Sequence, residues 1–559
     1  MEKILLIFNF IRQRRISLCS TFLFFMHSAF PQAGEWVWIK GDSIPSQPGN
    51  FGVQGVPSPA NNPPALYEPC EWTDLNGNFW MFGGLHYVAG LNSYGDLWKY
   101  NPISNQWTWM KGSGVQNDAG NYGTQGVPSP TNNPPSRGWG SGTWVDQQGN
   151  LWMFGGLGYP IGSYSDLWMY NILTNEWTWV KGPNVTNDLG SYGIQGVPSL
   201  ANNPGSRSES AATWTDSNGK LWLFGGKGIS LGANFFNDLW RYDISSNEWT
   251  WMKGSLQTVS GVYGFKGIED SLNTPGERGA FSRWKDDTGK LWLFAGYDFT
   301  NSSALNDLWK FNIVTNCWTW MGGDSTQGAS SVYGTKCTNS LTNMPGARFE
   351  NRAAWTDSDN NFWTFGGTET SSNQNGWNDL WKYCVTANEW IWISGDNITN
   401  PPGHWGIQGV SSQNNKPNAR NGSAGWSDSF KNIYFFGGFT SQAWNSYNDL
   451  WKYTIDTTCG VCANTTSIAE NNSPEADELL VFPNPANSTL TISFLSSEKQ
   501  NIELRLYNTL GKQIYVEKEQ TTKGKFEKEI NLEKWNGGIY FLQLKTKDEN
   551  INKKVIVNH

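Results

Sequence analysis

The chain has 559 residues, of which 15% are aromatic, including 34 Trp, and only 16% are charged. This length is more than one ordinary hydrophobic core holds and indicates two domains or a repeat architecture, and the abundance of aromatic residues and Gly favours strands joined by turns. The formal net charge of −8 would repel phosphate groups, so we expect no nucleic-acid partner.

The N-terminus has the order of features that is typical of an export signal. Arginines between residues 12 and 15 precede an apolar run over residues 16–30, and Ala33 suits a cleavage site. We expect residues 1–33 to be a signal peptide. A membrane anchor is the alternative, but the run is short for a span and contains His27, so we expect no transmembrane segment in the mature chain.

The phrase Asp-Leu-Trp recurs six times, at spacings of 69 to 72 residues. A Phe-Gly-Gly phrase, once Phe-Ala-Gly, precedes each copy, and a Trp-x-Trp pair follows each of the first five. Each unit divides into four predicted strands, with Asn218-Gly219 suited to the first turn of the third unit. In that unit the strands are residues 211–215, 220–224, 238–242 and 248–252. Four antiparallel strands in each of six units predict the blades of a β-propeller.

The two ends of the repeat region complement each other. The sixth unit stops after its third strand at Tyr453, and the missing Trp-x-Trp pair is found near the start of the chain, as Trp36 and Trp38. An N-terminal strand that completes the last blade would close the ring and pair strand edges that would otherwise stay open. We therefore expect a closed six-bladed propeller over residues 34–458.

Three features of the unit resemble the kelch family. They are the Gly-Gly pair that ends the second strand, an aromatic residue in the third strand and a Trp in the fourth. Examples are Tyr100, Tyr170 and Tyr242 in the third strand, and Trp107, Trp177 and Trp249 in the fourth. The unit is longer than the kelch repeat of about 50 residues. The resemblance implies an all-β, six-bladed kelch-type β-propeller, similar to that of galactose oxidase.

The composition changes after the repeats. Residues 459–476 are a polar linker, and residues 477–559 are richer in Lys and Glu, with a single Trp. Short alternating runs in this part predict a small immunoglobulin-like β-sandwich. The alternating runs are residues 490–494, 502–507, 525–531 and 539–545.

Several motifs of this second domain resemble the C-terminal sorting domain of type IX secretion cargo in Bacteroidota. They are residues 482–485 (Phe-Pro-Asn-Pro), 510–512, 537–540 and 553–557. The resemblance implies that residues 477–559 engage the type IX secretion machinery and that the protein is secreted or attached to the outer-membrane surface. An ordinary immunoglobulin-like module is the alternative.

Six of the seven cysteines lie outside the predicted signal. In an exported protein they are expected to form disulfides rather than metal sites, but the spacing does not define the connectivity. Cys459 and Cys462 could pair locally. The six cysteines are Cys70, Cys317, Cys337, Cys384, Cys459 and Cys462.

Long, divergent connections precede the first strand of each unit and join its second and third strands. The up-and-down strand order places these connections on one face, which is the expected binding surface. Trp444, with Tyr447 nearby, could stack on a sugar or pack within its loop.

Five arginines precede the first strands of units two to six, and Ala65 takes this place in unit one. They could bind a carboxylate or sulfate at the mouth of the channel, or they could pair with the repeated aspartates. The five residues are Arg137, Arg207, Arg278, Arg348 and Arg420.

Catalytic readings receive less support. His86, His404 and His559 are too few and too dispersed for a copper site, so we expect no metal or other cofactor. Carboxylates near the first strands could act as acid and base, but nothing in the sequence pairs them, and we assign no catalytic residue. They are Glu68, Glu209, Glu277 and Glu350.

We therefore expect a surface binding or adhesion protein that recognises an extracellular glycan or protein. The alternatives are a carbohydrate-active enzyme without copper and a structural surface component without a discrete pocket.

Overall fold

The computed structural model describes most of the chain after residue 32, as strands, turns and loops without a helix. The described ranges are residues 33–87, 90–209, 211–228, 235–255, 259–298, 301–369, 375–440, 445–462, 479–484, 486–496, 498–508, 512–547 and 550–558. The predicted signal peptide and Trp444 lie outside them. Within these ranges, no helix is long and apolar enough to span a bilayer. The chain divides into two compact units, residues 1–465 and 466–559.

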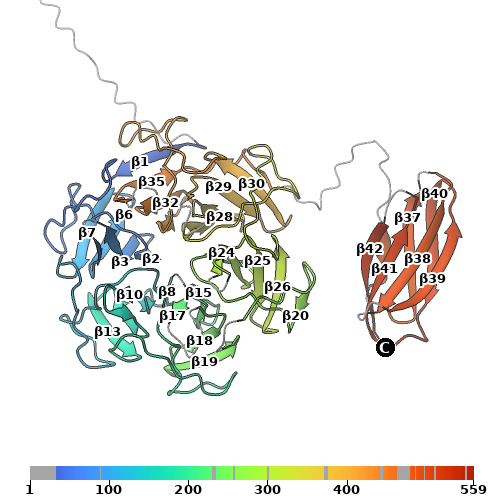
Figure 1. The fold of residues 1–559 in the computed structure, drawn as a ribbon, viewed down its shortest axis with the longest axis horizontal. Coiled ribbons are helices and arrows are strands. Elements are labelled where there is room, and N and C mark those ends of the chain that lie inside the picture. Colours follow the sequence, from blue (N-terminus) through green and yellow to red (C-terminus); the bar gives the residue numbers. More distant parts are fainter. Residues whose placement is uncertain are drawn as a thin grey trace, which may run out of the picture. The chain divides into compact units, whose positions relative to one another are not determined.

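Among the described residues, the first unit contains six antiparallel sheets of four or five strands, which follow one another around a common centre (Figure 1). Sheet 1 consists of β2 (Cys70–Thr73), β3 (Phe79–Phe82), β6 (Leu97–Asn101) and β7 (Gln106–Lys111). Sheet 2 consists of β8 (Gly142–Val145), β9 (Leu151–Phe154), β12 (Leu167–Asn171) and β13 (Glu176–Lys181). Sheet 3 consists of β15 (Ala212–Thr215), β16 (Leu221–Phe224), β18 (Leu239–Asp243) and β19 (Glu248–Lys253).

The remaining three sheets repeat this order, with the first strand innermost. Sheet 4 consists of β21 (Ser282–Lys285), β22 (Leu291–Phe294), β25 (Leu308–Asn312) and β26 (Cys317–Gly322), with β20 (Glu269–Asp270) beside β26. Sheet 5 consists of β27 (Ala354–Thr356), β28 (Phe362–Phe365), β29 (Leu380–Cys384) and β30 (Glu389–Ser394). Sheet 6 consists of β31 (Ala424–Ser427), β32 (Ile433–Phe436), β35 (Leu450–Tyr453) and the N-terminal strand β1 (Trp36–Lys40).

The N-terminal strand is the outermost strand of sheet 6. It runs antiparallel to β35, with Trp36 opposite Tyr453 and Trp38 opposite Trp451. Trp36 is almost fully buried and packs edge-on against Phe365 of sheet 5. The first and last strands of the unit are thus neighbours in one sheet.

Hydrophobic side chains fill the spaces between neighbouring sheets, and each space holds its own buried cluster. The cluster between sheets 1 and 6 includes Phe79, which stacks on Trp426 with ring centroids 5.4 Å apart. Along the centre, β2 lies against both β8 and β31. The second strands are buried along their whole length because they face a neighbouring sheet on either side.

A carboxylate organises the turn between the first and second strands of each sheet. In sheet 3, Asp216 accepts hydrogen bonds from the backbone N–H groups of Asn218 and Lys220 and from Trp222 Nε1. Gly219 has φ +75°, as expected for this predicted turn. We call the side of the unit that carries these turns the turn face.

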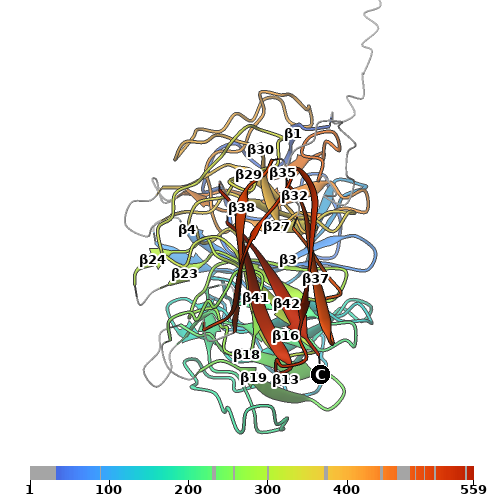
Figure 2. The same cartoon turned by 90° about the vertical axis from the view of Figure 1, so that its right-hand side faces the viewer.

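The opposite side, which we call the loop face, carries the connections between second and third strands. Figure 2 shows β4, β23 and β24 together on this side. Its hairpins are β4 (Leu85–Tyr87) with β5 (Leu91–Ser93), β10 (Leu157–Gly158) with β11 (Gly162–Ser163), β23 (Tyr297–Asp298) with β24 (Ser303–Ala304), and β33 (Phe439–Thr440) with β34 (Asn445–Ser446). A further pair joins β14 (Arg207–Ser208) to β17 (Lys227–Gly228).

The long connections between sheets do not all belong to the loop face. Part of each covers the outer edge of the next sheet, where Gly55 N–H donates to the carbonyl of Trp109 and Asn61 Nδ2 to that of Trp107. Asn415 makes the equivalent bond to the carbonyl of Trp36 in sheet 6. The extra length of the repeat therefore satisfies the exposed edges of the outermost strands.

The second unit consists of two sheets that share one apolar core. The first sheet contains β36 (Leu480–Phe482), β37 (Thr489–Ser496) and β40 (Gly524–Asn531). The second contains β39 (Gln513–Gln520), β38 (Asn501–Asn508), β41 (Gly538–Lys545) and β42 (Asn550–Val557). Ile492 from the first sheet and Leu504 and Leu542 from the second are fully buried in this core.

Candidate functional site

The five predicted arginines each pair with the repeated aspartate of their own sheet. In sheet 3, Arg207 Nη1 and Nη2 donate to the two carboxylate oxygens of Asp238 at 2.8 and 2.9 Å. Nη1 also donates to the carbonyl of Gly225 at the end of β16, and Nε donates to that of Gly205. The equivalent pairs are Arg137–Asp166, Arg278–Asp307, Arg348–Asp379 and Arg420–Asp449.

This arrangement corresponds to the second of the two expectations for these arginines. The side chains of all five pairs are at most 1% exposed. A ligand would have to replace a buried bidentate ion pair to reach any of the guanidinium groups. The geometry therefore assigns the arginines to holding the loop before each inner strand against its sheet.

The predicted aromatic pair is split between described and undescribed residues. Tyr447 is buried, with its ring over the Arg420 guanidinium at 4.7 Å and beside Trp405 at 6.0 Å. It belongs to the arginine cluster of sheet 6. Stacking of Trp444 on a sugar stays a prediction, because Trp444 lies outside the described residues.

Residues with positive φ lie around the centre of the loop face, next to the innermost strands. One such residue precedes the first strand of each sheet, and we call these six positions the mouth ring. Five of these residues donate their backbone N–H to the carbonyl of the corresponding residue in the preceding sheet. Glu209 donates to Trp139 at 2.6 Å, for example, and Glu68 in sheet 1 donates to Gly422 in sheet 6 at 2.8 Å. The mouth ring consists of Glu68, Trp139, Glu209, Ala280, Glu350 and Gly422.

Three carboxylates occupy alternate positions of the mouth ring. Glu68, Glu209 and Glu350 are close enough to influence one another and Tyr67 electrostatically. Burial, and then the charges of Glu68 and Glu209, raise the pKa of Glu350 well above its usual range, and its carboxylate accepts a hydrogen bond from Tyr67. Burial also raises the pKa of Glu209, which Lys227 Nζ approaches at 3.6 Å.

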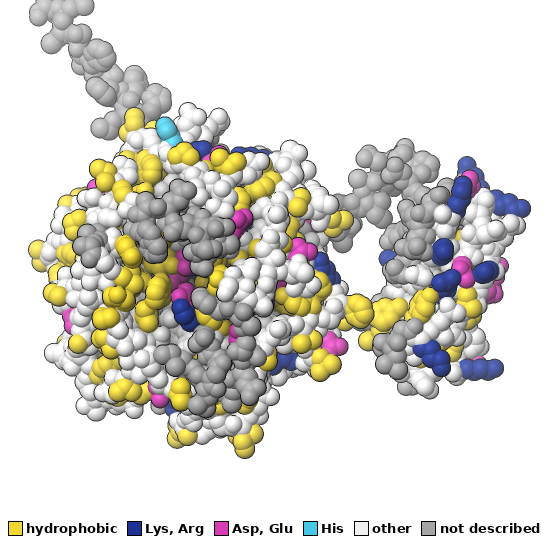
Figure 3. Space-filling model, in the orientation of Figure 1, with side chains coloured by type: hydrophobic (Ala, Val, Ile, Leu, Met, Phe, Trp, Pro, Cys, Tyr) yellow, Lys and Arg dark blue, Asp and Glu magenta, His cyan; other side chains and the backbone are white. Residues whose placement is uncertain are grey.

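The convergence of these carboxylates was not predicted, although the sequence carries a signal for it. The three glutamates are spaced by 141 residues, which is two repeat units. Trp139 adds an aromatic side chain to the mouth ring, with Lys227 Nζ 5.7 Å from the ring centroid. Figure 3 shows acidic side chains and a basic one at the centre of the loop face. Glu277, the fourth predicted carboxylate, is buried outside this ring.

The histidines are not brought together. His86 is buried in β4 of the loop face, where its Nδ1 is 2.7 Å from the carbonyl oxygen of Ala65, and His404 is exposed on the connection between sheets 5 and 6. His559 lies outside the described residues. Within the part of the chain that is described, no group of three or more His, Cys, Asp or Glu side chains is placed to hold a metal ion.

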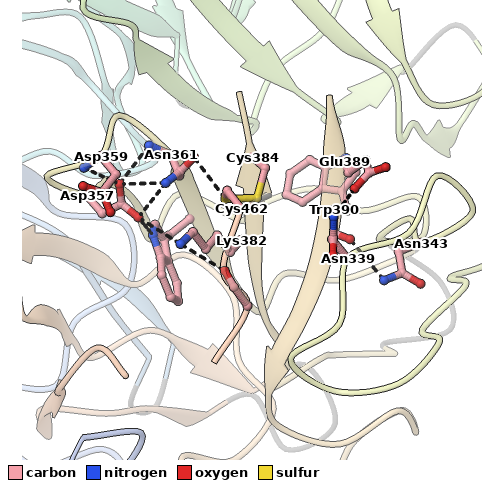
Figure 4. The surroundings of a disulfide bond; sticks show 12 residues. Asn339, Asn343, Asp357, Asp359, Asn361, Lys382, Cys384, Glu389, Trp390 and Cys462 are labelled. Carbon is pink, nitrogen blue, oxygen red and sulfur yellow. Dashed lines mark hydrogen bonds and ion pairs between the residues drawn. A yellow bond between two sulfur atoms is a disulfide. The ribbon is translucent and has the colours of Figure 1, made fainter. Parts of the chain in front are cut away.

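Two disulfides hold the segment after β35. One joins it to β29 of sheet 5 (Figure 4), and the other joins it to the connection between sheets 4 and 5, which covers the outer edge of sheet 5. Cys459 bonds to Cys337, and Cys462 bonds to Cys384 at the end of β29. Lys382 Nζ donates to the carbonyl of Gly460 between them. The local pairing of Cys459 with Cys462 is therefore wrong, because each of these cysteines is bonded to a cysteine in a different part of the chain.

The other two cysteines of the expected disulfide set are free thiols in the described structure. Cys70 is fully buried in β2, and burial raises its pKa to about 11. Cys317 begins β26 and is partly exposed. The expectation of disulfides for these two residues is wrong, since neither has a cysteine opposite it.

Two comparisons with known families match separate parts of the chain. Residues 118–319 match the model of a KLHDC2/KLHL20/DRC7 Kelch-repeats domain, and residues 480–558 match the model of a secretion system C-terminal sorting domain. No curated protein matches the chain. Both predicted resemblances are thereby confirmed. The sorting domain identifies a secreted or cell-surface cargo protein and implies an interaction with the type IX secretion machinery.

Proposed function

We propose that this protein is an exported binding protein that recognises an extracellular protein or glycan through the loop face of a closed six-bladed kelch-type propeller. In this proposal residues 1–33 are the signal peptide, residues 34–458 the propeller and residues 459–476 the linker. Residues 477–559 form an immunoglobulin-like sorting domain, which delivers the propeller to the surface of a cell of the Bacteroidota type.

Two contacts between the ends of the repeat region support ring closure. Sheets 1 and 6 enclose a hydrophobic cluster like those between the other neighbours, and β1 supplies the fourth strand of sheet 6. The mouth-ring bond from Glu68 to Gly422 also joins these two sheets. Because β1 pairs with β35, a closed ring leaves no edge of sheet 6 open where the repeat region begins and ends, and it gives the loop face a rigid base.

The mouth ring is the observation that carries the binding proposal. It brings carboxylates, the Tyr67 hydroxyl and the Trp139 indole to the centre of the loop face on a hydrogen-bonded backbone. Polar groups held on a rigid frame lose little entropy when a ligand binds, which favours affinity and specificity. The five arginines and Tyr447 contribute by holding the loops, and Trp444 stays a predicted ligand contact.

The proposal is tested with the purified mature chain on a glycan array and by crosslinking to extracellular proteins. Trp139→Ala and Glu350→Gln are expected to lose binding, and Trp444→Ala to lose only glycan binding. Phe430→Ala is the matched control, because this aromatic residue is 82% exposed on the turn face. Unchanged binding by both mouth-ring variants would contradict the proposal.

A second candidate function is a carbohydrate-active enzyme. The raised pKa of Glu350 beside Glu68 favours it, because a protonated carboxyl next to a carboxylate is the acid and base pair used in glycoside hydrolysis. The test is release of reducing sugar from a polysaccharide panel by the wild type and by Glu350→Gln. Absence of release by the wild type would argue against this function.

A further inference from the structure

A polar cavity lies between the innermost strands of the six sheets, on the turn-face side of the mouth ring. It has a volume of about 210 Å³ and is lined by residues of the six innermost strands. The residue that precedes the Trp of each innermost strand decides the size of the cavity, because this residue is small in sheets 5 and 6, where Ala354 and Gly425 leave space. The others are Glu71, Thr143, Thr213 and Arg283.

The cavity becomes more accessible toward the turn face. Thr143 and Thr213, at the second position of their strands, are buried, whereas Thr73 and Lys285, at the fourth position, are exposed. The mouth ring lies before the first residue of each strand, at the opposite end of these strands. A ligand of this cavity therefore enters from the face opposite the proposed binding surface.

Two arginines share one carboxylate in this cavity. Arg352 Nη2 donates to Glu71 Oε2 at 2.5 Å, and Arg283 Nη2 donates to Glu71 Oε1 at 3.3 Å and to Thr143 Oγ1 at 3.4 Å. The Arg352 side chain is only 1% exposed. Its Nε and Nη1, and also Thr213 Oγ1, have no hydrogen-bond partner among the described residues.

This cavity leaves buried donor groups without an acceptor among the described residues. The nitrogen atoms of buried guanidinium groups normally have acceptors, and all three nitrogens of Arg207, for example, donate a hydrogen bond. Glu71 supplies one negative charge to two positive ones. Toward the mouth ring, Glu68 and Glu350 add to the field at Arg352, but Glu350 is hydrogen-bonded to Tyr67.

We propose that this cavity binds a small oxyanion, that is, a carboxylate, sulfate or phosphate group, held by Arg283 and Arg352 with the threonine hydroxyls as further donors. Planar guanidinium groups match such oxygens with paired hydrogen bonds. The volume accommodates about seven water molecules at ~30 Å³ each, which suits a free ion or the acidic group of a sugar rather than a whole oligosaccharide.

The test is titration calorimetry of the mature chain with sulfate, phosphate and acetate, at constant ionic strength in chloride. A second arm compares glucuronate with glucose and distinguishes a sugar-borne carboxylate from a free ion. Arg283→Gln is expected to weaken binding by about tenfold or more, because it removes a charge-assisted donor. Arg241→Gln on β18, outside the cavity, is the matched control and is expected to bind like the wild type.

Glu71→Gln keeps the test decisive if Arg283→Gln folds poorly. This variant removes the carboxylate that competes for both arginines, so it is expected to bind the anion more tightly than the wild type. Loss of folding cannot produce tighter binding. Equal affinity in the wild type and Arg283→Gln, or no heat with any anion at millimolar concentration, would overturn the proposal.

Discussion

The repeated aspartate has two different environments in this protein, one in sheet 1 and another in sheets 2 to 6. Asp238 of sheet 3 accepts hydrogen bonds from Arg207, from the Tyr192 hydroxyl and from Trp240 Nε1. Asp96 of sheet 1 is equally buried but accepts only from Trp109 Nε1 and the N–H of Gly114, both through Oδ1. Its Oδ2 has no partner among the described residues.

Two substitutions in sheet 1 explain the difference. Ala65 stands at the arginine position and Phe51 at the tyrosine position. Phe51 still packs against Trp98 and Trp109, with centroids 5.0 and 5.2 Å away, as Tyr192 packs against its two Trp residues. The ring contacts are thus retained where the polar contacts are lost. Sheet 1 therefore forms with the aromatic packing but without the ion pair that the other five sheets also have.

The carboxyl group of Asp96, which lacks these partners, binds a proton more readily than an ordinary aspartate does. Burial raises its pKa from 3.8 to about 7, against the lowering effect of its two hydrogen bonds. A neutral carboxyl costs far less to bury than a carboxylate, so sheet 1 tolerates the loss of its arginine near neutral pH.

The largest expected effect on stability comes from removing the arginine partner of the repeated aspartate in a sheet other than sheet 1. Arg207→Met leaves Asp238 buried without its ion pair and is expected to cost about 3–5 kcal/mol of unfolding free energy. Urea unfolding at neutral pH measures it, with Arg241→Met on the same sheet as the control. A change below about 1 kcal/mol would mean that the ion pairs are as dispensable in the other sheets as in sheet 1.

The next largest effect is a pH dependence of the unfolding free energy that arises from Asp96 in sheet 1. Because the pKa of Asp96 is higher in the folded state, the proton stabilises the fold fully below about pH 4, and this stabilisation is lost as the pH rises to about 7. Asp96→Asn is neutral at every pH. Relative to the wild type it is therefore expected to gain a few kcal/mol between pH 4 and pH 8.

Unfolding free energies of the wild type and Asp96→Asn across this pH range measure the gain. Other buried carboxyls, such as Glu350, contribute to both proteins and cancel in the difference. Parallel curves for the two proteins would show that Asp96 does not titrate between these pH values.

The smallest effect restores one polar contact. Phe51→Tyr places a hydroxyl where Tyr192 has one and is expected to stabilise the fold by about 1 kcal/mol, because Asp96 gains a donor. It also lowers the pKa of Asp96, so the gain is larger at pH 8 than at pH 5. Thermal unfolding at both pH values checks this, and a loss of stability at pH 8 would show that the hydroxyl does not reach Asp96.

The strands of the repeat were largely predictable, and the site was not. The predicted third strand of unit three, residues 238–242, is β18 shifted by one residue, because Gly-Gly and Trp positions mark every unit alike. The all-β class is confirmed. The set of side chains that meet at the centre depends on how each sheet is rotated relative to the next. The local sequence pattern does not specify this rotation.

The cysteines show the same limit. Cys337 and Cys459 are separated by 122 residues, and Cys384 and Cys462 by 78. Nothing in the spacing of Cys459 and Cys462 indicates that each has a distant partner. Similarly, the unpaired state of Asp96 follows from Ala65 and Phe51 together, and only the first of these was noted from the sequence.

The disulfide to sheet 5 also determines how the protein carries mechanical load. A pull on the chain beyond Cys462 passes through the sulfur bridge into Cys384 and so into β29. It bypasses β35, whose hydrogen bonds to β1 would otherwise be peeled apart one at a time from Tyr453. A pull applied beyond Cys462 therefore acts on covalent bonds and on β29 before it reaches the hydrogen bonds between β1 and β35.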